Sequence, residues 1–343
     1  MSIRPVFAFL FCAALPALAQ PTNGNGDKTL PFANTSDAEH QRQIATVIGG
    51  LTASGPVPVP GALAVRGAAE EVALAEWLMK ALDRVPDAAS PQARNLAPGE
   101  FRLATGEENL VRVVHLPWVQ TPQELAEVST VVRSVGDIRR LYVYEPLKTI
   151  SMRGTPEQIA MADWLVAQLG FKDAASRTPK FQLKGTGEHV LCVMDASFTR
   201  TPQELAEAAT VVRGLADLRR VFTYNVGRVV VARGTEDQIA LADWLFQQLA
   251  SKPATRAIVY DHAVPEPVGV ARPAAAIEDR LTIFFPAVTD ADALAKVATA
   301  LRVEVQLRRV FAYGAARALA VRGNAEQLAM ADRLLRERGY LAP

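Results

Sequence analysis

The feature that most constrains this chain is an internal repeat. The segment from Gly154 to Leu165 (GTPEQIAMADWL) recurs almost unchanged from Gly234 to Leu245 (GTEDQIALADWL). It returns at 323–334 as GNAEQLAMADRL and, more loosely, at 67–78 as GAAEEVALAEWL. Because such a repeat means that one structural unit is copied along the chain, it sets the domain organisation before any single element is assigned.

Within one copy, the periodicity predicts the order strand, helix, strand, strand, helix. Residues 111–116 form a short β-branched run that is typical of a strand. Residues 121–124 (TPQE) have the composition of a helix start, with a capping Thr and a Pro in the first turn. Apolar runs at 141–144 and 149–152 predict two strands, and Gly154 then precedes a second capped helix.

We therefore predict an α+β chain of four tandem β-α-β-β-α modules, of which the first is degenerate. The first helix of this degenerate module is predicted to be capped by Ser36 and Glu39. The predicted boundaries are a signal peptide at 1–19, a disordered N-terminus at 20–27, module 1 at 28–85, a linker at 86–108, module 2 at 109–170, a linker at 171–187, module 3 at 188–250, a linker at 251–278 and module 4 at 279–339. The linkers are rich in Pro, Ala, Gly and Ser, although Ala257 to Tyr260 could add a short strand. Such small modules bury little core alone, so packing between neighbours would supply the rest.

The N-terminal residues predict export. Arg4, the apolar stretch from Val6 to Leu15 and the sequence Ala17-Leu18-Ala19 match the three parts of a secretory signal peptide, with cleavage after Ala19. No later segment has an apolar run long enough to predict a transmembrane helix. We therefore expect an exported protein that is periplasmic or associated with the cell envelope.

Charge and cysteine content narrow the function classes. The chain has 37 basic and 36 acidic side chains, and residues 1–19 contain one cation and no anion. The exported chain is then balanced, which argues against non-specific nucleic-acid binding. Cys192 is the only cysteine after residue 19, so we expect neither an intramolecular disulfide nor a cysteine metal site. Its apolar neighbours predict a buried position on a strand.

No motif points to catalysis. The four histidines (His40, His115, His189 and His262) have no metal-ligand spacing, and no phosphate loop, dinucleotide fingerprint or nucleophile elbow is present. We predict no catalytic residue, no cofactor and no metal site. A hydrolase whose catalytic residues come together from distant positions stays an open alternative, because such sites need no local motif.

Three sets of repeated residues are candidates for structural or interface roles. An arginine at the end of a strand and an acid ten residues later predict repeated ion pairs: Arg66 with Glu76, Arg153 with Asp163, Arg233 with Asp243, and Arg322 with Asp332. The alternative is a ladder of charges at interfaces between modules or subunits. The other two sets are interface candidates: the double arginines Arg139, Arg140, Arg219, Arg220, Arg308 and Arg309, and the tryptophans Trp77, Trp164 and Trp244.

Each interface candidate has a structural alternative. The tryptophans, replaced by Arg333 in module 4, should be half-buried against a neighbouring strand or linker if they are not binding residues. The double arginines precede runs that alternate aromatic and aliphatic residues. One sheet face could thus offer cations and aromatic rings to an acidic protein or glycan, or could simply be an amphipathic exposed face.

The order of these elements resembles the secretin N-domain repeats. The shared pattern is a strand, a helix beginning T-x-x-E-L-A, two strands ending in Arg-Gly, and a helix beginning T-P-E-Q-I-A, and it is strongest over 111–170 and 188–250. The resemblance implies small modules that stack into periplasmic rings of secretion and pilus channels. The secretin barrel region is not expected here. RNA-binding KH domains are similar in element order, but the GxxG loop that they need between helices is not found in the modules.

The sequence thus favours a non-enzymatic, exported assembly or interaction component of the cell envelope, related to secretion or pilus systems. Its partner would be an envelope protein or a second copy of the chain, so an oligomer is compatible with the sequence. The alternative is a periplasmic accessory protein that binds a glycan or a peptide between modules.

Overall fold

A computed structural model describes residues 25–84, 99–170, 178–184, 187–251, 256–262, 264–265 and 279–341. Among them are eight α-helices and four small antiparallel sheets, which together make a mixed α+β fold. The predicted signal peptide at 1–19 lies outside the described residues. None of the described helices is long and apolar enough to cross a membrane.

Module 1 contains a three-stranded sheet and two helices. In chain order its elements are β1 (Asn25–Pro31), α1 (Ala38–Leu51), β2 (Val57–Val59), β3 (Ala62–Ala68) and α2 (Ala69–Leu82). The sheet has the order β1-β3-β2. Two expectations are wrong at this end. Residues 25–27, predicted as disordered, pair with β3 in β1, and α1 is capped by Asp37, whose carboxylate accepts a hydrogen bond from the His40 amide.

Modules 2 to 4 share one larger pattern with a four-stranded sheet. Module 2 contains β4 (Gly99–Arg102), β5 (Leu110–His115), α3 (Pro122–Gly136), β6 (Arg140–Tyr144), the short 3₁₀ helix η2 (Glu145–Leu147), β7 (Thr149–Gly154) and α4 (Pro156–Gly170). Module 3 contains β8 (Lys180–Gln182), β9 (Val190–Asp195), α5 (Pro202–Leu215), β10 (Arg220–Tyr224), β11 (Val229–Gly234) and α6 (Glu236–Ala250). Module 4 contains β12 (Ile258–Val259), β13 (Arg280–Phe284), α7 (Ala291–Glu304), β14 (Arg309–Tyr313), β15 (Ala318–Gly323) and α8 (Ala325–Glu337).

Each of these three modules begins with an edge strand that lies in a predicted linker. The sheets have the orders β4-β5-β7-β6, β8-β9-β11-β10 and β12-β13-β15-β14. Only β12 was anticipated, at Ala257 to Tyr260. The linkers 86–108, 171–187 and 251–278 are therefore predicted too long. The strands β4 and β8 escaped detection because three or four residues are too few to show an alternating pattern.

The helix starts follow the capping residues of the repeat. The Thr121 hydroxyl accepts a hydrogen bond from the Glu124 amide at 3.1 Å. Thr155 and Gln158 cap each other reciprocally, because each side chain accepts a hydrogen bond from the other residue's backbone amide, at 2.9 and 3.2 Å. These contacts satisfy amides that the helix itself leaves unpaired.

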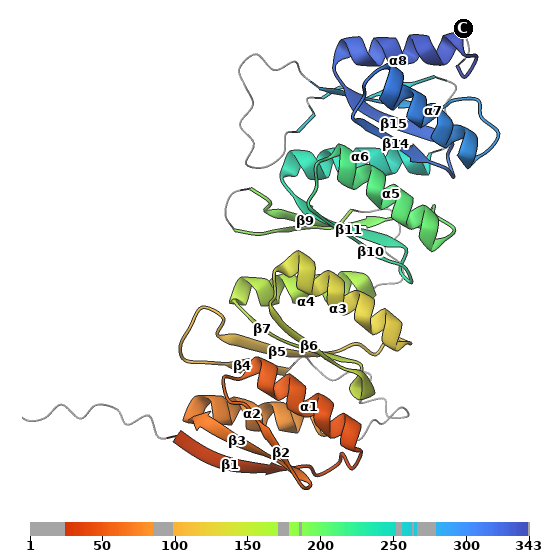
Figure 1. The fold of residues 1–343 in the computed structure, drawn as a ribbon. Coiled ribbons are helices and arrows are strands. Elements are labelled where there is room, and N and C mark those ends of the chain that lie inside the picture. Colours follow the sequence, from red (N-terminus) through yellow and green to blue (C-terminus); the bar gives the residue numbers. More distant parts are fainter. Residues whose placement is uncertain are drawn as a thin grey trace, which may run out of the picture.

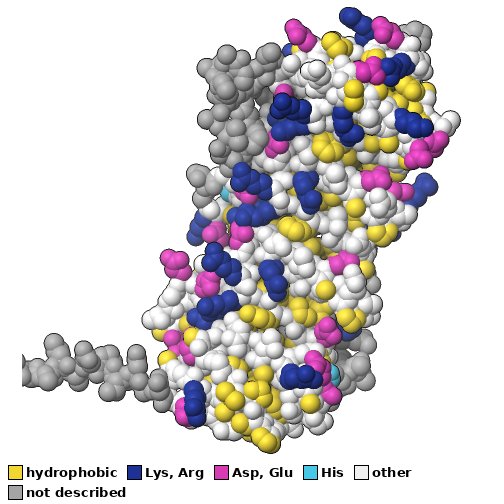
Figure 2. All heavy atoms as spheres, viewed as in Figure 1, with side chains coloured by type: hydrophobic (Ala, Val, Ile, Leu, Met, Phe, Trp, Pro, Cys, Tyr) yellow, Lys and Arg dark blue, Asp and Glu magenta, His cyan; other side chains and the backbone are white. Residues whose placement is uncertain are grey.

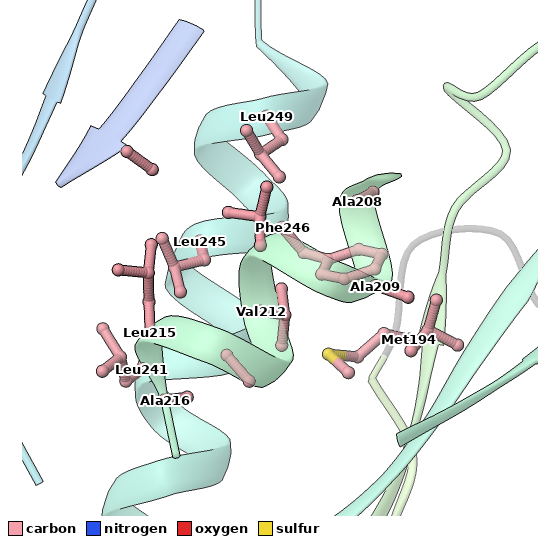
Figure 3. Packing of buried hydrophobic residues seen from close by; sticks show 14 of the residues in the cluster. Met194, Ala208, Ala209, Val212, Leu215, Ala216, Leu241, Leu245, Phe246 and Leu249 are labelled. Atoms are coloured by element: carbon pink, nitrogen blue, oxygen red, sulfur yellow. The ribbon is translucent and has the colours of Figure 1, made fainter. Parts of the chain in front are cut away.

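The modules are stacked as alternating layers of sheet and helix (Figure 1). The helices of one module cover one face of its own sheet and also meet the opposite face of the next module's sheet. The buried clusters show this directly, since one of them joins α5 and α6 of module 3 to Leu281, Ile283 and Tyr313 of module 4. Figure 3 shows Val212 and Leu215 of α5 beside Leu241 and Leu245 of α6 in that cluster. The hydrophobic core is therefore shared between neighbours.

Cys192 provides a simple test of this core. It lies fully buried on β9, as its neighbours predict, and burial raises the pKa of its thiol to about 12. In a Cys12→Ser variant, we expect a thiol reagent at pH 8 to modify Cys192 only after denaturation, because thiolate and access are both lacking in the native state. A Val226→Cys substitution at an exposed turn should react at once, and equally fast labelling of Cys192 would contradict its burial.

Candidate protein interface

The second face of each four-stranded sheet is covered by the preceding module. Tyr144, Tyr224 and Tyr313, which end β6, β10 and β14, are at most 2% exposed. The idea of an exposed face of aromatics and cations is therefore wrong for these sheets. The helices α1, α3 and α5 lie across that face, against β6, β10 and β14 respectively. We call each of these three contacts a junction.

Aromatic rings and small helix residues fit together at the junctions. A Cβ atom added to Gly50 of α1 would lie 2.0 Å from the ring of Tyr142, and one added to Gly214 of α5 would lie 2.1 Å from the ring of Phe311. Glycine weakens a helix by about 1 kcal/mol relative to alanine. Close approach of the next module's ring is the physical reason for its presence at these two positions.

Polar contacts lie at the N-terminal ends of α3 and α5, far from the C-terminal position that Gly50 and Gly214 occupy in α1 and α5. The Tyr224 hydroxyl donates a hydrogen bond to the buried Glu124 carboxylate of α3. Burial and this carboxylate raise the pKa of Tyr224, and burial near Glu204 and Glu207 raises the pKa of Tyr313 to about 12. Glu127 accepts a hydrogen bond from the Asn225 amide at 3.1 Å.

The backbone contact recurs at the third junction. There Glu207 accepts a hydrogen bond from the Gly314 amide at 3.2 Å. The second and third junctions are thus fixed at the N-terminal ends of α3 and α5, where acidic side chains accept hydrogen bonds from the next module.

At the C-terminal end of the helix, an arginine of the next module completes each junction. The guanidinium of Arg153 donates to the Leu51 carbonyl at 2.8 Å, that of Arg233 to the Val135 carbonyl at 3.0 Å, and that of Arg322 to the Leu215 carbonyl at 2.9 Å. The last carbonyls of a helix lack intrahelical partners and carry partial negative charge, so a cation there is stabilising.

An acidic side chain of the preceding module adds an ion pair to each of these arginines. Glu71 lies 3.3 Å from Arg153, Asp137 lies 3.3 Å from Arg233, and Asp217 lies 2.7 Å from Arg322.

The predicted ion pairs within each module are therefore wrong in their partners. Among the described residues, the acids pair elsewhere: Glu76 with Lys28, Asp163 with Arg112, Asp243 with Thr178, and Asp332 with Arg336, while Arg66 pairs with Asp27. The reason is strand alternation. Arg153 lies on the same sheet face as Ser151 and Tyr142, which is opposite to the face that α4 covers. The alternative of a charge ladder between modules describes the observed contacts better.

The two arginines of each pair have different environments. Arg220 lies 2.8 Å from Asp137 and 2.7 Å from Glu188, and Arg309 lies 2.6 Å from Asp217, so both belong to junctions. Arg140 lies 3.9 Å from Glu108 of its own module. The first arginine of each pair is exposed, and these residues are Arg139, Arg219 and Arg308.

The tryptophans lie half-buried against the edge strand of the following module. The ring centroid of Trp77 lies 5.8 Å from that of Phe101, Trp164 lies 5.5 Å from Phe181, and Trp244 lies 5.0 Å from Tyr260. The half-buried position against a neighbouring strand agrees with the sequence, although β12 was the only one of the three partner strands that was anticipated. Arg333 takes this position in α8.

The described residues include a close histidine–hydroxyl pair, which raises the question of a catalytic or metal-binding site. No group of three His, Cys, Asp or Glu side chains among them could hold a metal ion. His115 Nδ1 lies 2.9 Å from the Thr149 hydroxyl, but Thr149 is fully buried and its hydroxyl donates to the Leu147 carbonyl. Burial lowers the pKa of His115, so this pair is a satisfied part of the core.

The junction arginines allow a matched comparison of stability. We expect Arg233→Met to lower the free energy of unfolding by about 2–3 kcal/mol, because it removes a charged hydrogen bond and leaves a helix-end carbonyl without its donor. Arg66→Met changes the same repeat position on the module 1 sheet, where the arginine side chain is 78% exposed, and should cost less than about 0.5 kcal/mol. Urea denaturation measures both, and equal losses would refute the role of the junction.

A second comparison tests the fit of rings against glycines. Gly214→Ala should destabilise the protein by roughly 1–3 kcal/mol despite the better helix propensity of alanine, because the new methyl group overlaps the Phe311 ring. The control is Val303→Ala, the same helix position in α7, which should change stability by less than about 0.5 kcal/mol. Thermal and urea unfolding report the difference, and a stabilised Gly214→Ala protein would count against the close contact.

Neither a protein-family model nor a curated protein matches the sequence. The solved structures that match include secretins, the family that the repeat resembles. The chain is 14% identical to Aeromonas hydrophila ExeD over 66% of this chain and 41% of that chain, with a TM-score of 0.16.

Two further solved structures are of the same kind. The N-terminal domain of the secretin XcpQ from Pseudomonas aeruginosa matches at 14% identity over 66% of this chain and 100% of that chain, with a TM-score of 0.21. The type II secretion system secretin GspD in E. coli K12 matches at 13% identity over 68% and 39%, with a TM-score of 0.16. The chain thus spans about two fifths of the length of ExeD and GspD. At these TM-scores the likeness carries no functional argument.

Proposed function

We propose that this chain is a non-enzymatic scaffold of the cell envelope, built of secretin N-domain-like modules, that binds an acidic protein partner along one side of its stack. The observation that supports this most is the exposed arginine that recurs once in each of modules 2, 3 and 4, at Arg139, Arg219 and Arg308. Repetition of a cation at equivalent positions of stacked modules gives a row of binding points rather than a single site.

The backbone fixes where these arginines are placed. Two residues before each arginine, the backbone is in the left-handed region. The φ angle is 52° at Asp137, 53° at Asp217 and 56° at Gln306. The turn out of each first helix is therefore the same in all three modules. Figure 2 shows Lys and Arg side chains at successive levels along the face in view, with acidic side chains among them.

A repeated row of weak contacts suits a protein partner. A single exposed ion pair contributes only about 0–1 kcal/mol. Several contacts at fixed spacing act together, because each one raises the effective concentration of the next. Arginine also forms planar, paired hydrogen bonds with carboxylates, which favours an acidic protein surface. The signal-peptide pattern and the family resemblance favour an envelope location and a link to secretion or pilus systems.

A hollow beside the second junction favours the alternative of a glycan or peptide ligand. It has a volume of about 460 Å³ and is lined by Gln123, Glu127, Arg213, Thr223 and Asn225, among others. That volume lies within the range of about 300–1,000 Å³ that is typical of ligand sites. Amide, hydroxyl and guanidinium groups such as these could hydrogen-bond a polar ligand. The scaffold is preferred because the arginine position recurs in three modules and this hollow lies at one junction.

The proposal can be tested by placing a photoreactive amino acid at positions 139, 219 and 308 in cells that naturally make the protein. We expect all three positions to crosslink to the same envelope protein, and the yield to fall several-fold when the other two arginines are changed to glutamate. Crosslinks from position 226, an exposed turn residue of similar accessibility, serve as the control. The scaffold proposal fails if each arginine position captures a different protein or captures none, and binding of an oligosaccharide that Thr223→Trp abolishes would favour the alternative.

A further inference from the structure

The two ends of the stack expose positions that the junctions bury elsewhere. At the first end, on the outer face of the module 1 sheet, Val57 and Val59 of β2 are 57% and 37% exposed. By their pairing with β3 they occupy the positions of Tyr142 and Tyr144 in β6. Figure 2 shows hydrophobic side chains gathered over this lower end of the stack, where β1, β2 and β3 lie (Figure 1).

The other end presents the matching helix positions. Val303 of α7 is 70% exposed and takes the place of the junction residues Gly50, Ser134 and Gly214. Met330 of α8 is 52% exposed, whereas Leu74, Met161 and Leu241 at the same repeat position are fully buried under the next sheet. Among the described residues, four of the six large hydrophobic side chains that are exposed are these two valines of β2, Val303 and Met330.

The residues at the two ends differ from the junction residues in a coordinated way. Where a junction packs an aromatic ring on glycine or serine, the two ends offer Val57 and Val303, two side chains of middle size. Where the Tyr224 hydroxyl meets Glu124, the ends offer Val59 and Ala293, both without a polar group.

The same holds for the backbone contact. Where the Asn225 amide meets Glu127, one end has Pro60, which lacks a donor, and the other has Lys296, which lacks an acceptor. A change on one side is thus accompanied by a suitable change on the other.

These ends are unlike those that only terminate a stack. Terminal repeats of solenoid proteins carry a polar outer face, which keeps them soluble and prevents further stacking. Here apolar side chains remain at the contact positions of both ends. Arg66 also keeps the repeat position of Arg153, Arg233 and Arg322, and its side chain is 78% exposed. Its ion-pair partner among the described residues is Asp27 of its own sheet, and not an acid beside the end of a helix.

We infer that the α7–α8 end of one copy docks on the β1–β3 face of a second copy, so that the stack continues head to tail from chain to chain. This inference rests on the proposed scaffold role and names a second copy as a partner. Val303 would pack against Val57, and Arg66 would donate to the backbone carbonyls at the end of α7. Because the two contacting surfaces differ, each copy keeps one free end after docking, and the association is open rather than limited to a dimer.

Sedimentation velocity on purified residues 20–343, which retain every described residue, tests the inference without any other protein. The mean mass should rise with concentration past that of a dimer. Val57→Asp at one end and Met330→Asp at the other should each weaken association at least about tenfold, since both would bury an unpaired charge. Val226→Asp, on an equally exposed turn away from both ends, is the matched control and should associate like the unmodified chain.

Mixing the two blocked variants separates head-to-tail docking from other modes. Val57→Asp keeps an intact α7–α8 end and Met330→Asp keeps an intact β1–β3 face, so an equimolar mixture should form 1:1 dimers and nothing larger. A monomer at every concentration, or a symmetric dimer that the mixture does not restore, overturns the inference. Either result leaves the arginine crosslinks to another envelope protein unaffected, so failure of this inference is distinct from failure of the scaffold proposal.

Discussion

Everything in this fold depends on covering both faces of a very small sheet. Each module has two helices, and they cover only one face of its three or four strands. The opposite face carries the rings and aliphatic side chains of strands such as β6 and β10, which would be costly to leave in water. The helices of the preceding module supply the missing cover. A module of this kind is therefore half of a folding unit, and its stability includes a large contribution from its neighbour.

Burial alone would allow a helix to lie across a sheet in several orientations, and the junction contacts select one. Glycine at position 50 or 214 allows close approach only where the ring of the next module lies above it. At the same C-terminal end of the helix, an arginine of the next module donates to the last carbonyls, with an acid beside it. Both contacts are directional, whereas apolar burial is not. Together they explain why the three junctions resemble each other so closely.

The parts that the sequence could predict are those in which signals are local. The helices follow from the spacing of their apolar residues and from the threonine caps, and the main strands follow from short apolar runs. The half-buried tryptophans follow from their place beside an apolar stripe. The short strands β4 and β8 were missed because they lack enough residues to show a pattern. The ion pairs were misassigned because Arg153 and Asp163 are close in the chain but lie on opposite faces of the sheet. Partners in the preceding module, about 80 to 100 residues away, leave no mark in a local spacing.

The repeat does contain the information that local spacing lacks, provided that positions are compared between modules rather than within one. One helix position holds Gly50, Ser134 and Gly214 in the first three modules and Val303 in the fourth. The strand position opposite it is aromatic in modules 2 to 4 and is Val57 in module 1. This joint change indicates a contact between the two positions. The same comparison links Glu127 to Asn225, and Lys296 to Pro60. Such paired changes arise when both sides of an interface must fit. Random drift at two solvent-exposed ends would be expected to place charged side chains there, since these are the residues that exposed positions favour. The apolar side chains of Val57, Val59, Val303 and Met330 are therefore those that the inferred docking of a second copy requires at the two ends.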